Sequence, residues 1–217
     1  MKLSAFLTSL LTIFVIVAHV VFAESVVGST PPLKLPNFDG VPNTLSSSPV
    51  SKVELGKLEV KFGQATLGSL LDLVGAGRIE HKGDAADSEA WVCFTVPSHK
   101  QSQRIWITSS ELGGPEHIVD GIYVLLSDKR LQSSPGCPDL PRQFVPVSLN
   151  RATVRLGLTA HSLKKWMGEP SAERDHWYLY SYSGEIPTTK MDETALLGAR
   201  IVDGRIVALF ATQTVTN

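Results

Sequence analysis

The sequence lacks the charge excess and the motifs that several functional classes need. Its 20 Lys and Arg balance 21 Asp and Glu, giving a formal net charge of -1, and no basic cluster stands out that could neutralise phosphates. A Gly-x-Ser-x-Gly elbow, a phosphate-binding loop, a dinucleotide fingerprint and a His-Glu-x-x-His pair are all missing from the chain. We therefore expect no nucleic-acid partner, no cofactor and no enzymatic activity.

Cysteine is also scarce, with Cys93 and Cys137 as the whole complement. A structural zinc site needs closely spaced ligands, so two distant cysteines with scattered histidines predict no metal site. In an oxidising compartment the two thiols are expected to form a disulfide, and two free thiols are the alternative. Closing a loop of about 45 residues would stabilise the fold by roughly 3 to 4 kcal/mol.

The first residues have the features of a secretory signal peptide. Lys2 precedes a long apolar run, and Val21 and Ala23 supply small residues around a cut before Glu24. The alternative is an uncleaved membrane anchor, because the run is roughly long enough to span a bilayer. No cysteine lies near the cut, so a lipid anchor is not expected. We predict signal peptide 1–23 and a mature protein that is periplasmic or secreted, without an integral membrane anchor.

Residues 24–52 are dense in Pro, Ser, Gly and Asn and show no hydrophobic period. Such a segment cannot offset its ordering entropy by burying apolar surface. It is predicted to be a linker or extended arm. A segment that becomes ordered on a partner is the alternative.

The rest of the chain shows signs of a duplication. The stretches "VKFGQATLGSLLDLVG" from Val60 and "VRLGLTAHSLKKWMG" from Val154 share a Gly, a Thr, a Ser-Leu pair and a closing Gly. Each predicts a helix that begins after a capping Thr and ends at a Gly. In the second copy Leu163, Trp166 and Met167 are expected to form the buried stripe.

Strand patterns follow each predicted helix. "AWVCFTV" from Ala90 matches "HWYLYSY" from His176, and a Val-Asp-Gly turn signal precedes the last strand of each half. The predicted fold class is α+β, with two repeated units, each a helix followed by a three- to four-stranded antiparallel sheet. The units are expected at residues 53–130 and 151–217, joined by a Pro-rich connection over 131–150.

The stretch "LGLTAHSLKKWMGEPSAERDHWYLYSYSGE" resembles the β-lactamase-inhibitor-protein-like superfamily, which includes the small lipoprotein of the outer-membrane β-barrel assembly machinery. The shared pattern is a Gly, a helix ending in Leu-Gly-x-Pro or similar, and a Trp-aromatic strand, with Met167 here in place of the Leu. The resemblance covers residues 54–217 as a tandem pair, although the first half lacks the Pro, and it implies a protein-binding module. "WVCFTVPSHKQSQRIWITSSELGG" also resembles uncharacterised exported bacterial proteins, which implies no activity.

Three tryptophans are candidates for a binding surface. Strand alternation places Trp91 and Trp177 on the sheet face opposite the helices, at equivalent positions of the two halves, and Trp106 is a further candidate. Exposed indoles on one surface would form an apolar patch of the kind that marks an interaction site. The alternative is that the indoles fill the seam between the halves.

One loop could be drawn as a catalytic site. "SSELGGPEH" brings Ser110, Glu111 and His117 together in sequence, as a nucleophile and a base would be. A polar turn between two strands is the favoured interpretation, because Gly-Gly-Pro is a turn signal.

These observations favour an exported, non-enzymatic protein-binding scaffold whose partner is an unknown envelope or secreted protein. The first alternative is an inhibitor of a periplasmic or secreted hydrolase, such as a β-lactamase or a cell-wall enzyme, which would need a loop that enters an active site. The second is an enzyme of unknown type. A scaffold alone does not decide among them, because function depends on the site.

Overall fold

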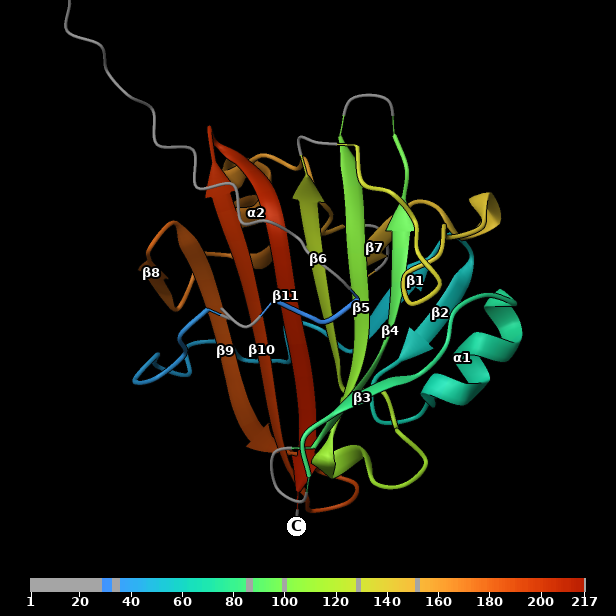
Figure 1. Cartoon of the computed structure of the whole chain (residues 1–217). Helices are drawn as coiled ribbons and strands as arrows, with labels where there is room; N and C mark the ends of the chain where they lie inside the picture. Colours follow the sequence, from blue (N-terminus) through green and yellow to red (C-terminus); the bar gives the residue numbers. More distant parts are fainter. Residues whose placement is uncertain are drawn as a thin grey trace, which may run out of the picture.

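The computed structural model describes residues 29–32, 36–84, 88–98, 101–127, 130–150 and 153–216 (Figure 1). The predicted signal peptide 1–23 lies outside these residues. An eight-stranded sheet forms the centre of the molecule. Its strands are β3 (Glu80–Lys82), β4 (Glu89–Val96), β5 (Ser102–Ser110), β6 (Gly121–Ser127), β8 (Ala172–Arg174), β9 (Trp177–Glu185), β10 (Asp192–Val202) and β11 (Arg205–Thr216).

The predicted α+β fold of two helix-and-sheet units was wrong. The strand order is β3-β4-β5-β6-β11-β10-β9-β8, antiparallel at each pairing, so both halves of the chain share one continuous sheet. β6 and β11 pair at its centre, with Gly121 opposite Thr212 and Leu125 opposite Ala208. This pairing removes the open edge that each half would otherwise expose. Strand residues far outnumber helical ones in the described chain, and the protein is mostly β.

A second, three-stranded sheet consists of β2 (Leu58–Lys61), β1 (Lys52–Leu55) and β7 (Val147–Leu149), in that order. β7 belongs to the segment predicted as the Pro-rich connection, which also carries the short 3-10 helix η3 (Arg142–Phe144). Residues separated by 94 positions therefore meet here, because Ser148 pairs with Glu54 across β7 and β1.

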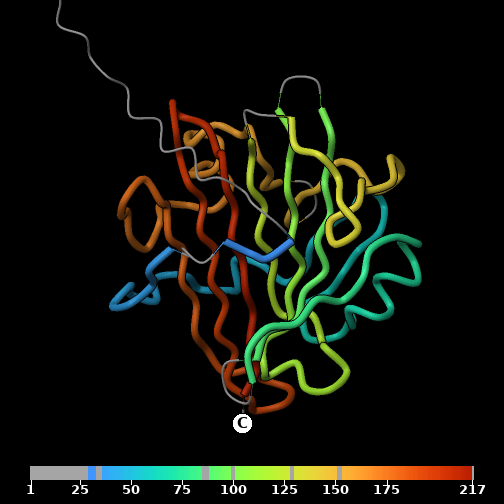
Figure 2. The backbone as a smooth tube through the Cα atoms, viewed as in Figure 1, coloured from blue at the N-terminus to red at the C-terminus, as the bar shows by residue number. Residues whose placement is uncertain are grey.

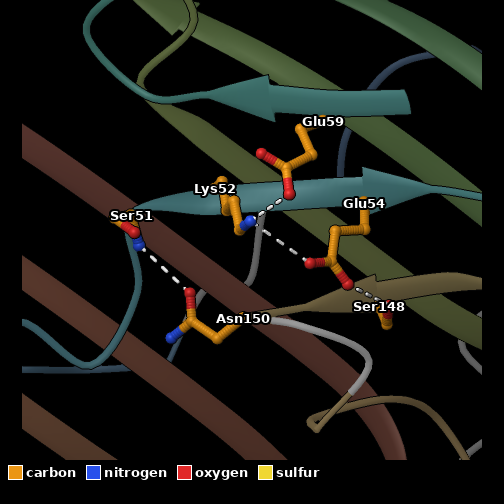
Figure 3. A network of polar contacts seen from close by, with 6 residues as sticks. All are labelled: Ser51, Lys52, Glu54, Glu59, Ser148 and Asn150. Carbon is orange, nitrogen blue, oxygen red and sulfur yellow. Dashed lines mark hydrogen bonds and ion pairs between the residues drawn. The ribbon is translucent and has the colours of Figure 1, made fainter. Parts of the chain in front are cut away.

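The outer face of this small sheet carries a network of contacts between charged and polar side chains (Figure 3). The ammonium group of Lys52 contacts the carboxylates of Glu54, at 3.5 Å, and Glu59, and the hydrogen bond with Glu59 is the main cause that raises the pKa of Lys52. The Ser148 hydroxyl donates to Glu54 across 3.1 Å. Residues directly opposite each other on β1 and β2 have like charge, as Glu54 and Glu59 do. The attraction between the two strands therefore joins diagonal neighbours, Lys52 and Glu59.

Helix α1 (Leu67–Val74) forms where the sequence predicts it. Thr66 caps its first turn by accepting from the backbone N–H of Ser69, whose hydroxyl oxygen in turn accepts from the backbone N–H of Thr66. Gly75 ends the helix with a φ of 71°, a conformation that a residue without a Cβ adopts at little cost. Leu67, Leu70 and Val74 are buried, and Leu71 is partly buried against the same core.

Helix α2 (Ala160–Met167) is capped in the same way by Thr159, which accepts from the backbone N–H of Ser162. Its predicted buried stripe was only partly right. Leu163 is fully buried, but 65% of Trp166 is exposed to solvent. Because this two-turn helix has one fully buried residue, Leu163, its other side chains remain in contact with solvent.

The large sheet has an apolar core on each face. Side chains alternate along β4, so Val92 and Phe94 join one core while Trp91 and Cys93 join the other. The first core lies under both helices and the three-stranded sheet. The second contains three tryptophans and the disulfide, and Figure 2 shows that the chain near the N-terminus crosses the sheet on that side. Both faces of the sheet are therefore covered.

Candidate functional site

The three candidate tryptophans lie together on the face opposite the helices, but they are buried. Trp91 is 3%, Trp106 0% and Trp177 9% exposed, and all three belong to the second core. Alternation predicted the shared face, whereas the expected exposure was wrong. The reason is that other segments of the chain cover this face, so it presents no apolar patch of indoles.

One cover is the N-terminal arm, meaning described residues 29–32 and 36–50. The indole N–H of Trp106 donates to the main-chain oxygen of Ser29 across 2.8 Å. Further along, the ring of Phe38 lies 6.1 Å from the ring of Phe210 on β11. The arm then passes the β8 side of the sheet, where Arg174 donates to the main-chain oxygen of Asp39 across 2.6 Å. The described part of the arm therefore packs against the sheet and differs from a free linker.

The second cover is the segment around Cys137. The predicted disulfide between Cys93 and Cys137 is confirmed, joining residues 44 positions apart. The neighbouring Thr95 of β4 accepts at its main-chain oxygen from Leu140, across 2.7 Å, and donates to the oxygen of Pro138, across 2.8 Å. The bridged segment thus lies along β4 like an extra strand and occupies its outer edge. Disulfides persist in oxidising surroundings, which indicates a location outside the cytoplasm.

The opposite side of the large sheet is different, because β8 covers only the beginning of β9. The pairs between β8 and β9 end at Ala172 and Leu179. Beyond that point no strand of the described chain pairs with β9 on the side away from β10. Asp175 and His176 form a two-residue turn, both with positive φ. Such a turn closes on a hydrogen-bonded pair, so alternate residues from Trp177 onward direct their main-chain groups away from β10.

Three residues of β9 occupy these outward positions beyond β8. The N–H of Ser181 is satisfied by the Ser171 hydroxyl at 3.1 Å, and its own hydroxyl donates to Asn43 of the arm. Ser183 and Glu185 follow, and among the described residues nothing bonds their outward main-chain groups. Both residues are exposed to solvent. We call residues 183–185 the open edge of β9.

The candidate loop does not assemble as a nucleophile with a base. Ser110 donates to the carboxylate of Asp120 through both its hydroxyl and, at 2.9 Å, its backbone N–H. Glu111 begins the 3-10 helix η2 (Glu111–Gly113). The main-chain oxygen of His117 accepts from Leu67 at the start of α1, and no hydrogen bond within the described chain joins the side chains of His117 and Ser110. These contacts fit a structural turn.

Asp120 was not predicted as a site residue, yet it lies where β5, β6 and β11 meet. Its N–H donates to Thr108 of β5 and its oxygen accepts from Gln213 of β11, so it links three strands at the start of β6. Burial raises the pKa of Asp120, and its hydrogen bonds from Ser110 act in the opposite direction. The pKa of Glu89 is also raised, first by burial and then by the negative charge of Asp120.

Two of the hollows on the surface of the described chain bear on function. The larger, about 420 Å³, lies where the β8–β9 and β10–β11 turns meet, and Glu173, Asp175 and Asp203 are among its lining residues. These turn residues could not be linked from the sequence, because their proximity depends on the pairing of β9 with β10. Within the described residues, no group of three His, Cys, Asp or Glu side chains is placed to hold a metal ion. The search of those residues for a helix long and apolar enough to span a membrane found none.

Comparison of this chain with known protein families, curated proteins and solved structures finds no match. The resemblance to the β-lactamase-inhibitor-protein-like superfamily therefore stays a prediction.

Proposed function

We propose that this protein is an exported, non-enzymatic scaffold that binds another envelope or secreted protein by adding a strand of that partner to the open edge of β9. The observation that carries the proposal is the outward row of main-chain groups at Ser183 and Glu185, which have no bonds within the described chain. An extended peptide can satisfy such groups by continuing the sheet. Because the arm, the bridged segment, the helices and the small sheet cover both faces, the edge is the more accessible surface.

The asymmetry of the sheet supports this choice. At the β4 side, β3 and the disulfide-bonded segment occupy the outer edge. At the β9 side, the short β8 leaves the end of the strand uncovered. Open edges favour unwanted pairing, and proteins commonly protect them with Lys, Pro or a covering segment. Ser183 supplies no such protection, and Glu185 is the single charged side chain on this stretch.

The partner would be isolated with the mature chain as bait and identified by mass spectrometry. Ser183→Pro removes the outward N–H donor and is expected to abolish capture. The fold should persist, because a proline is tolerated on an edge strand when its N–H position faces solvent. Ser183→Thr keeps the donor and is the matched control, so capture should be retained.

Hydrogen exchange on the purified complex provides the decisive measurement. The amides of Ser183 and Glu185 should become protected when the partner is bound. Equal capture by Ser183→Pro and wild type, or protection confined to other surfaces, would show that the edge is not the binding site.

Export is the other part of the proposal and has its own test. The apolar N-terminus and the Cys93–Cys137 bridge both support a periplasmic or secreted location. Protein recovered from the cell envelope or the medium should begin at Glu24 or within one or two residues of it. Recovery of membrane-bound protein that retains Met1 would contradict cleavage of the signal peptide.

A further inference from the structure

The smaller of the two hollows described above has no acidic side chain in its lining. It measures about 330 Å³, at the lower end of the range of about 300 to 1,000 Å³ that is usual for small-molecule sites. It lies between the segment that leads into β7, the chain just before α2, and β5. Its lining residues are Gln103, Val145, Pro146, Val147, Arg155, Leu156, Gly157 and Leu158.

Apolar side chains form part of the wall of this hollow. Leu156 and Leu158 are partly buried and pack against the first core, while they also border the hollow. Val145, which also lines the hollow, has 38% of its surface exposed to solvent. Apolar side chains left in contact with water gain free energy when an apolar molecule displaces that water. These side chains can contact the apolar part of a ligand that also has a polar group.

The charged side chain that lines the hollow is positive. Arg155 and Gln103 line it, and neither side chain has a hydrogen bond or ion pair with the described residues. No Asp or Glu is among the lining residues, in contrast with the larger hollow and its three carboxylates. The guanidinium of Arg205 lies close by, because it donates to the main-chain oxygen of Gly157 across 2.9 Å.

We propose that this hollow binds a small amphiphilic carboxylate of the medium-chain fatty-acid type. The carboxylate accepts hydrogen bonds from the Arg155 guanidinium and the Gln103 amide, and the alkyl chain lies along Val145, Leu156 and Leu158. A guanidinium donates to a carboxylate through two parallel hydrogen bonds, which fixes the orientation of the head group. This site is separate from the open edge of β9 and does not depend on the proposed partner.

The test compares three probes that share an eight-carbon chain, namely octanoate, octylamine and octanol. Each is titrated into the isotope-labelled mature chain, and backbone amide shifts are followed by NMR. Octanoate should produce saturable shifts at Leu156, Gly157 and Leu158. Octylamine should bind at least about tenfold more weakly, because its charge is repelled by Arg155 and its carboxylate contacts are lost. Octanol should fall between the two.

Two arginine variants make the result specific. Arg155→Gln should weaken octanoate binding by about tenfold and leave octanol binding unchanged, since only the head-group contacts are lost. Arg142→Gln is the matched control, because Arg142 is exposed in the neighbouring η3 but does not line the hollow. Circular dichroism would show that both variants are folded. Octanoate shifts that do not saturate, equal binding of octylamine, or an unchanged affinity in Arg155→Gln would each overturn the proposal.

Discussion

The indole N–H of Trp106 donates to the main-chain oxygen of Ser29, a residue 77 positions away in the sequence. This bond holds the first described residues of the chain against the centre of the large sheet. It gives a buried polar group its partner and brings the arm over a face that alternation alone would leave exposed. The arm is thus part of the folded structure and closes the second core.

The arm should therefore contribute to stability. Phe38→Ala removes a partly buried ring that lies against Phe210, and it is expected to lower the free energy of unfolding by about 1 to 3 kcal/mol. Urea unfolding followed by tryptophan fluorescence would measure the change. Asn37→Ala, at the exposed neighbouring position, should have little effect, and a Phe38 variant as stable as wild type would show that the arm is loosely attached.

The buried tryptophans should behave as core residues. Trp177→Ala is expected to cost about 3 to 5 kcal/mol, the usual result of emptying the space of a buried aromatic side chain. Thermal melts and near-ultraviolet circular dichroism would show the loss of packing. A Trp91→Ala, Trp177→Ala chain that kept its fold and its melting temperature would instead support exposed indoles at a binding face.

The disulfide should stabilise the fold by restricting the unfolded chain. For a loop of 44 positions the chain-entropy relation gives about 3 to 4 kcal/mol, so Cys93→Ser should lower the free energy of unfolding by about that amount. Cys137→Ser should give a similar loss, and the double variant should be no worse than either single one. Additive losses in the double variant would mean that the cysteines contribute through packing and not through their bond.

Stability should fall as the pH rises through the native pKa values of the Glu89 and Asp120 carboxyl groups. Both pKa values are raised above their ordinary values of 4.5 and 3.8, so the folded state holds these protons more tightly than the unfolded chain does. Below their ordinary pKa values, both carboxyl groups contribute fully to the free energy of unfolding. This contribution is lost as the pH rises and each carboxyl ionises in the folded protein.

Melting temperatures across this pH range would test the linkage. Asp120→Asn keeps an oxygen that can accept from Ser110 but cannot ionise, so the decline of melting temperature with pH should become shallower. Glu89→Gln should act in the same direction. A slope unchanged by both substitutions would show that other groups govern the pH dependence.

Local features were predictable from the sequence where local chemistry decides them. Thr66 and Thr159 begin their helices because a side-chain oxygen satisfies a free backbone N–H, and this needs no information from the rest of the fold. Strand alternation likewise put Trp91 and Trp177 on the same face. The disulfide followed from the scarcity of cysteine and the predicted export.

The two Val-Asp-Gly triplets show where local patterns fail. Asp203 and Gly204 form the tight turn between β10 and β11, with φ of 49° and 71°. Asp120 is buried instead, and a Cβ on Gly121 would lie 2.5 Å from the Thr108 hydroxyl, so the glycine there permits close packing between strands. The same tripeptide therefore forms a turn at one position and a buried start of a strand at the other. The difference depends on the strand order of the whole sheet. The covering arm and the open edge of β9 depend on that same long-range pairing.

The central position of β11 has a consequence for how the sheet is completed. This strand, Arg205–Thr216, follows the other seven along the chain and pairs with β6 on one side and β10 on the other, so the middle of the sheet depends on it. Such long-range closure slows folding. A premature stop codon that removes these twelve residues would not trim an edge. It would leave β6 and β10 facing a gap, each with unpaired main-chain groups, and the shortened chain would aggregate or be degraded.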